Sequence, residues 1–220
     1  MSPFDGLAMR STRRERERER HREEILASAL KVFCNRGYDN ATMADIAEQA
    51  EFAVGTLYRF FDGKQTLHDA LVVDAIRQTA DLAVKAIERG GTPVEQIERY
   101  IDLTSGLYFT HRDVLRIYFS QTAGNYFAEQ PSLAGEALDL HHRTRRKLAT
   151  VFRDGIVRGL FAQIEPEMLV VGLHGVSDSI FSEVLYRPSE FTAEKVAELR
   201  KRLFLDPVRL KPRIRLPAQE

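Results

Sequence analysis

Residues 42–67 read TMADIAEQAEFAVGTLYRFFDGKQTL. Thr42 is a preferred N-cap residue, and Asp45 follows three positions later, which is the pattern of a capping box at the start of a helix. The apolar residues that follow carry this helix for only two turns. A second short segment, residues 54–61, begins after a three-residue turn and ends before an Asp-Gly pair. Two short helices joined in this way form a helix-turn-helix, whose second helix fits the major groove of DNA.

A longer helix is expected before this pair. Its apolar residues share one face, and Gly37 stands where a helix C-terminus favours a left-handed residue. Residues 10–22, ahead of it, hold seven arginines and three glutamates. Two compatible interpretations are a solvated helix start with opposite charges three residues apart and a basic arm along a phosphate backbone. The apolar face comprises Ile25, Leu26, Ala29, Leu30 and Phe33, and the charge pairs are Glu15/Arg18, Arg16/Glu19 and Glu17/Arg20.

Residues 42–47 and 55–67, preceded by residues 25–33 and by an Arg-Gly-Tyr sequence at 36–38, closely resemble the DNA-binding signature of TetR-like transcriptional regulators. The resemblance covers residues 22–70. It implies that Thr42, Tyr58 and Lys64 contact phosphates, that Thr56 lies at the DNA surface, and that Val54, Gly55 and Arg59 face base edges. The chemistry agrees, because hydroxyl and ammonium groups suit phosphate oxygens and an arginine can read guanine in the major groove.

Three residues depart from the usual pattern of that family. Glu51 stands where the turn usually carries glycine, and Ala53 and Val54 stand where a serine cap and a lysine are common. A missing cap costs about 1 kcal/mol of helix stability. The missing lysine removes one potential contact with the DNA backbone. These departures keep an alternative open: a helical small-molecule-binding or interaction module with weak or lost DNA binding.

The rest of the chain is helical in pattern, and no run of period-two alternation bounded by hairpin turns predicts a strand. The predicted fold is therefore all-α with about nine helices. Further helices are expected at residues 64–89, 93–109, 112–123, 131–159, 166–186 and 192–205. The expected organisation is a basic arm (1–21), a helix-turn-helix domain (22–67), a larger helical domain (68–205) and an extended basic tail with three prolines (206–220). The resemblance implies that the larger domain binds a ligand and dimerises.

Aromatic residues are concentrated between Tyr100 and Gln130, a segment that holds seven of the twenty in the chain. An aromatic helical core and a pocket for a flat or apolar small molecule both fit this pattern. For a pocket, we expect aromatic walls and a few polar groups that orient the ligand. The candidate pocket residues are Tyr100, Tyr108, Tyr118, Gln121, Asn125 and His174.

Small residues recur three or four apart in the helix at 166–186, where they let another helix approach closely. We expect this face to join the helix at 192–205 and the same pair from a second subunit in a four-helix homodimer interface. Twofold symmetry would then match a palindromic operator with half-sites about 34 Å apart, or a multiple of that spacing. The candidate interface residues are Gly172, Gly175, Val176, Ser179, Leu199 and Leu203.

Composition and the absence of certain motifs exclude several classes of function. The chain has 32 basic and 32 acidic residues, and its single cysteine, Cys34, fits a reducing compartment. No apolar run approaches the ~20 residues that span a bilayer, so we expect a cytoplasmic protein without a membrane partner. With no clustered metal ligands and no nucleophile paired with a base, we expect neither an enzyme nor a cofactor or metal.

The expected partners are a double-stranded DNA operator, an apolar or aromatic small-molecule effector and a second copy of the chain. The expected function is a repressor that the effector releases from its operator. Zero net charge does not exclude DNA, because residues 10–22 carry a local excess of four positive charges and residues 52–61 contain Arg59 and no acid. A small footprint of a few phosphate contacts per subunit follows from this distribution.

Overall fold

The computed structural model describes residues 12–115 and 135–210. Within these ranges it contains nine α-helices and, apart from an isolated bridge between Phe161 and Arg209, no β-structure. The prediction of an all-α fold with about nine helices is confirmed. The chain divides into two compact units, Met1–Val72 and Val73–Glu220.

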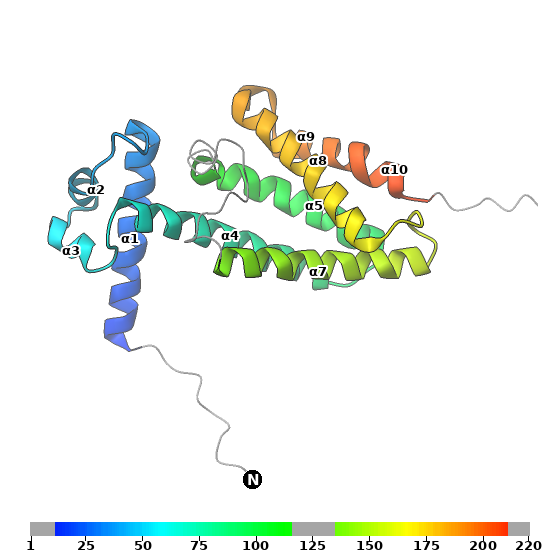
Figure 1. The fold of residues 1–220 in the computed structure, drawn as a ribbon, viewed down its shortest axis with the longest axis horizontal. Helices are drawn as coiled ribbons and strands as arrows, with labels where there is room; N and C mark the ends of the chain where they lie inside the picture. Colours follow the sequence, from blue (N-terminus) through cyan, green and yellow to red (C-terminus); the bar gives the residue numbers. More distant parts are fainter. Residues whose placement is uncertain (1–11, 116–134, 211–220) are drawn as a thin grey trace, which may run out of the picture. The chain divides into compact units, whose positions relative to one another are not determined.

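The first unit is built from α1 (Arg13–Arg36), α2 (Met43–Ala50), α3 (Val54–Tyr58) and the first turns of α4 (Lys64–Glu88). In this unit α1 packs on α2, and α2 packs on α3 (Figure 1). Burial of apolar side chains holds the three helices together. The most deeply buried of these side chains, each at most 1% exposed, include Ile25, Phe33, Ile46, Leu57 and Leu67.

Helix α1 begins at Arg13, so most of the segment expected as a basic arm is helix in the structure. Thr12 is the N-cap, and its backbone N–H donates to the Glu15 carboxylate at 2.6 Å in a capping box. Gly37 ends the helix with φ 77°, as predicted. The three predicted charge pairs do not form within this described helix; Arg20 pairs with Glu24 and Arg22 with Glu19 instead.

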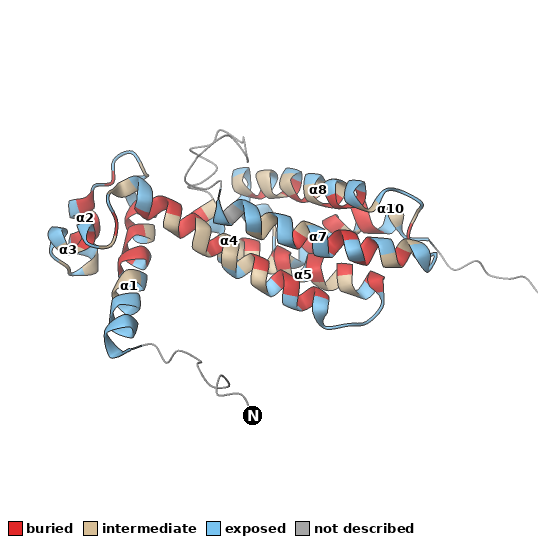
Figure 2. Cartoon of the chain, turned by 60° about the horizontal axis from the view of Figure 1, so that its bottom comes forward, coloured by how far each residue is buried: buried red, intermediate tan, exposed pale blue. Residues whose placement is uncertain are grey.

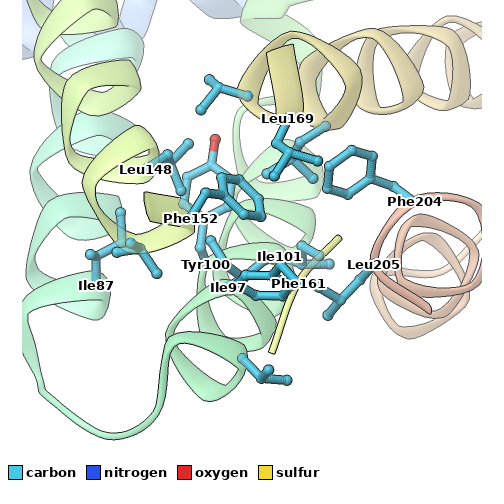
Figure 3. Close-up of a cluster of buried hydrophobic side chains, with 14 of the residues drawn as sticks. Ile87, Ile97, Tyr100, Ile101, Leu148, Phe152, Phe161, Leu169, Phe204 and Leu205 are labelled. Atoms are coloured by element: carbon cyan, nitrogen blue, oxygen red, sulfur yellow. The ribbon is translucent and has the colours of Figure 1, made fainter. Parts of the chain in front are cut away.

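The second unit contains the rest of α4 together with α5 (Pro93–Thr110), α7 (Glu136–Val157), α8 (Pro166–Tyr186) and α9 (Ala193–Arg200). Short helical turns complete it: η1 (Pro188–Glu190), η2 (Lys201–Leu205) and α10 (Asp206–Val208). Buried faces alternate with exposed ones along α5, α7 and α8 (Figure 2). Side chains from these helices and from η2 meet in one hydrophobic cluster, which includes Ile97, Leu148, Phe152, Leu169 and Phe204 (Figure 3).

The C-terminal segment differs from the expected extended tail as far as Leu210. Pro207 lies in the first turn of α10, where its missing N–H leaves no helical hydrogen bond unmade. The Ala162 N–H donates to the Val208 carbonyl and the Leu210 N–H to the Leu160 carbonyl, so this segment is attached to the second unit. Residues 211–220 lie outside the described part of the chain.

Among the described residues, α8 is one helix that is long and apolar enough, by length and composition, to cross a membrane. That test is a weak indication, because a core helix of a globular domain also passes it. Leu169, Val170 and Leu173 of α8 are buried in the hydrophobic cluster of the second unit. This burial accounts for part of the apolar sequence of α8, whereas Met168 and Val171 of the same helix are exposed.

Candidate functional site

The turn between α2 and α3 has a left-handed residue at its start. Glu51 adopts φ 57° and ψ 34°, and it is the one non-glycine residue with positive φ among those described. Its N–H donates to the Glu48 carbonyl, and the Phe52 N–H donates to the Ala47 carbonyl. Ala53 is the N-cap of α3 and supplies no side-chain hydrogen bond. Two of the three departures, Glu51 and Ala53, therefore stand where the backbone favours the usual residue of the family, a glycine and a serine cap.

Helix α3 presents most of its predicted DNA-contacting side chains to solvent. It is five residues long and ends at Tyr58, so residues 59–61 of the predicted segment follow it as a turn. Leu57 is fully buried and Phe61 is 6% exposed, so both belong to the core of the first unit. Tyr58 is 52% exposed, which argues against a packed core tyrosine. Of the remaining predicted contacts, Val54, Gly55 and Arg59 are exposed and Thr56 is half-buried.

Thr42 is exposed and Lys64 is half-buried. Both already form hydrogen bonds within the first unit. The Thr42 hydroxyl donates to the Asp45 carboxylate at 2.7 Å and accepts from the Asp45 N–H at 3.1 Å. These hydrogen bonds hold the pKa of Asp45 below its ordinary value. The Lys64 ammonium donates to the carbonyls of Tyr38 (2.6 Å) and Asp39 (3.1 Å). A phosphate can still approach the third donor of Lys64, whereas the Thr42 hydroxyl would have to exchange partners.

A groove runs between the start of α1 and the α2–α3 region, with a volume of about 640 Å³. Its walls carry three guanidinium groups, from Arg14 and Arg18 on α1 and from Arg59 after α3. None of the three forms an ion pair with the described residues, whereas Arg20 and Arg22 do. The other lining residues are Glu17, His21, Phe52, Thr56 and Phe60. The sequence indicated that this segment is basic. It did not indicate that Arg14 and Arg18, one helical turn apart, lie beside Arg59.

In the second unit, α5 and α8 bring two of the predicted pocket residues together. The Tyr100 hydroxyl lies 3.2 Å from Nε2 of His174. Burial lowers the pKa of His174 to about 3 and raises that of Tyr100. Tyr108 stacks on Phe181 with 4.0 Å between ring centres and donates to its carbonyl. Tyr100 and Tyr108 belong to hydrophobic clusters, as the core interpretation expects, and Tyr118, Gln121 and Asn125 lie outside the described residues.

Small residues on α8 have two different environments. A Cβ on Gly172 would lie 2.9 Å from Cε2 of Phe204, so this glycine is needed for packing within the subunit. Gly175 and Ser179 are exposed, and Val176 and Leu199 are half-buried. Leu203 is 59% exposed. The exposed members of this set are available to a second subunit.

His141 and His142 are adjacent on α7. Among the described residues no group of three or more His, Cys, Asp or Glu side chains is placed to hold a metal ion. His141 turns toward His174, with 5.4 Å between ring centres, and burial lowers its pKa to about 4. His142 is exposed to solvent.

Comparison with known proteins gives the following matches. The family model for bacterial regulatory proteins, tetR family, matches residues 25–71. The HTH-type transcriptional regulator LuxR of Vibrio harveyi is 27% identical over 189 residues, which cover 85% of this chain and 89% of LuxR. The HTH-type transcriptional repressor KstR of Mycolicibacterium smegmatis is 35% identical over 83 residues, which cover 38% of this chain and 40% of KstR. The solved structure of a TetR/AcrR-family regulator from Thermobifida fusca matches with TM-score 0.72 at 19% identity, covers 85% of this chain and 97% of that one, and shares the fold.

Proposed function

Because the chain is a TetR-like transcriptional regulator with a helix-turn-helix DNA-binding domain, we propose that it acts as a homodimeric repressor. Its two α3 helices bind a palindromic operator, and a small-molecule effector in the second unit releases them. The family consists of regulators and not of enzymes. A DNA-binding regulator of this kind acts in the cytoplasm.

The observation that carries the DNA-binding proposal is the exposed surface of α3 beside the groove. Tyr58 and Arg59 are solvent-exposed on a helix whose buried side holds Leu57 in the core. Arg14 and Arg18, which form no ion pair with any described residue, add two cations on the same groove. We assign Arg59, Val54 and Gly55 to base edges and the hydroxyl of Tyr58 and the ammonium of Lys64 to phosphates.

Repression and effector release are proposed on narrower grounds. KstR, which is 35% identical over 38% of this chain, is a repressor by name. The second unit contains a buried polar cluster around Tyr100 and His174 that the DNA-binding unit does not require. An effector releases DNA only if it binds the DNA-free arrangement more tightly than the bound one. Helix α4, which belongs to both units, provides a continuous element to carry that coupling.

The test is binding of the purified chain to DNA from upstream of its own gene, measured by fluorescence anisotropy at low and moderate salt. Tyr58→Phe removes an exposed hydroxyl and is expected to weaken binding to all sequences similarly, with unchanged thermal stability. Arg59→Ala is expected to change the order of preference among operator variants. If the wild-type chain does not bind DNA with or without ligands, the proposal fails in favour of a helical interaction module.

A further inference from the structure

Arg200 is a fully buried cation in the second unit. It is 1% exposed and lies at the end of α9, one turn after the buried Val196 and one turn before the buried Phe204. Burial lowers its pKa to about 10, so the guanidinium keeps its charge at neutral pH. A charge removed from water is strongly unfavourable unless an anion or dense hydrogen bonding compensates it.

All four hydrogen bonds of Arg200 go to uncharged oxygens. Nε donates to the Ser177 hydroxyl at 3.0 Å. Nη1 donates to three acceptors on α5 at 2.8 to 2.9 Å: the Ile101 carbonyl and the hydroxyls of Thr104 and Ser105. The hydroxyls of Thr104 and Ser177 donate their own protons to carbonyls one turn earlier, so they serve Arg200 only as acceptors.

The guanidinium lacks a partner in two respects. Within the described residues, Nη2 donates no hydrogen bond, and no carboxylate forms an ion pair with Arg200. Asp102, one nearby acid, pairs with Lys201 at 2.6 Å. Asp178, another, has its pKa raised to about 6 by burial, although attraction to Arg200 lowers it in part, and its carboxylate forms no ion pair with Arg200.

Aromatic groups surround this cation. Its central carbon lies 5.4 Å from the ring centre of Phe181 and 5.9 Å from that of Tyr100. The Tyr100 hydroxyl is 3.2 Å from Nε2 of His174, whose Nδ1 is buried and has no hydrogen-bond partner among the described residues. Among the described residues, the cluster therefore combines a buried cation without an ion pair, a ring nitrogen without a hydrogen bond and apolar aromatic faces.

We propose that the effector is an amphiphilic monocarboxylate whose carboxylate binds Nη2 of Arg200 and whose apolar body packs against Tyr100 and Phe181. This inference rests on the function proposed above, in which the second unit binds the effector. A carboxylate accepts charge-assisted hydrogen bonds from a guanidinium, whereas a neutral ligand leaves Arg200 without an ion pair. Because Arg200 joins α5, α8 and α9, a ligand bound to it acts on three helices at once.

If Arg200 only holds the helices together, a different result is expected for ligand binding. The bonds from Nε and Nη1 alone tie α9 to α5 and α8, and they predict no preference between an acid and its neutral analogue. Calorimetric titration of the full chain therefore compares octanoate and 4-phenylbutyrate with their primary amides, which have nearly the same shape. We expect at least one acid to bind about tenfold or more tightly than its amide, since hydrogen bonds to charged groups are stronger than neutral ones.

Two variants locate the preference. Arg200→Met removes the charge but keeps an unbranched apolar side chain, and it is expected to abolish the difference between acid and amide. Arg202→Met removes an exposed arginine two residues away, which pairs only with Glu198, and it is expected to leave the difference unchanged. If Arg200→Met does not fold, the wild-type chain still decides through octanoate labelled with ¹³C at the carboxyl group. Bound octanoate is expected to stay ionised at a lower pH than free octanoate.

The outcomes separate this inference from the function on which it rests. Equal binding of acid and amide, or no binding of either acid, overturns the carboxylate proposal but leaves a DNA-binding regulator with another effector. Unchanged acid preference in Arg200→Met also overturns it. DNA binding by the wild-type chain is measured in parallel. If the wild-type chain does not bind DNA, the proposed function is overturned, whichever ligand binds.

Discussion

Glu51 ends α2 in the left-handed region, at φ 57° and ψ 34°. In this conformation the Cβ of an L-residue approaches the neighbouring carbonyl oxygen, whereas glycine has no Cβ. Glu51→Gly is therefore expected to raise the free energy of unfolding by about 1 kcal/mol, less what the freer unfolded chain regains. Urea denaturation followed by circular dichroism measures the change.

Glu48→Gly is the matched control for that prediction. Glu48 is an exposed residue inside α2, three positions earlier and at ordinary helical dihedrals. The same change there is expected to lower stability by about 1 kcal/mol, because glycine is a poor helix former. If both changes lower stability equally, the left-handed conformation of residue 51 does not determine the outcome.

At the residue scale, local patterns were predictable and long-range contacts were not. Thr42 as a cap follows from its spacing to Asp45, and the structure confirms it. Arg200 gave only the weak signal of a charged residue on the apolar face of a helix, shared with Val196 and Phe204. Its partners lie 23 to 99 residues away in sequence, on helices whose packing local periodicity does not specify.

At the scale of helices, ends with a side-chain cap were predicted well. The capping box at Thr42 depends on a residue three positions later, Asp45, and it is present. The sequence left the start of α1 open between a solvated helix start and a basic arm, because alternating arginine and glutamate carry no apolar period. The structure has a helix there, capped by Thr12. The extension of α1 ahead of its buried face, which begins at Ile25, is mostly exposed, although His21 contacts Phe52 and Arg22 lies over Phe61.

We expect that extension to bind DNA phosphates with one face. Arg14 and Arg18 line the groove beside Arg59, whereas Arg16 and Arg20 do not. The double variant Arg14→Gln/Arg18→Gln is expected to weaken binding to all DNA sequences and to lower the slope of log K against log salt by up to about two. Arg16→Gln/Arg20→Gln removes the same charge from another face. Equal effects of the two double variants would mean that only net charge matters.

At the scale of the whole molecule, the helical content and the two units follow from sequence patterns, but the interface with a second copy does not. A stripe of small residues predicted close approach on α8, and the structure explains Gly172 by its contact with Phe204 in the same subunit. The exposed apolar side chains next to that stripe are a different signal, which only the structure reveals. Val171 is 43% exposed and Leu203 is 59% exposed, although both are large and apolar.

These two side chains test the proposed homodimer. Val171→Glu and Leu203→Glu place a charge on exposed positions of α8 and η2, so neither is expected to disturb the fold of the subunit. In an apolar dimer interface, however, an unpaired carboxylate is desolvated, and sedimentation equilibrium is expected to show a dissociation constant raised about tenfold or more. Val157→Glu, at a position 82% exposed at the end of α7, is the control and is expected to leave the dimer intact.

The same variants connect association to DNA binding. A monomer presents one α3 to one half-site, whereas a dimer gains the second half-site without a second loss of translational freedom. Val171→Glu and Leu203→Glu are therefore expected to weaken binding to a full palindrome and to leave binding to an isolated half-site unchanged. A variant that is monomeric yet binds the palindrome as tightly as the wild-type chain would show that operator affinity does not depend on this face of α8 and η2.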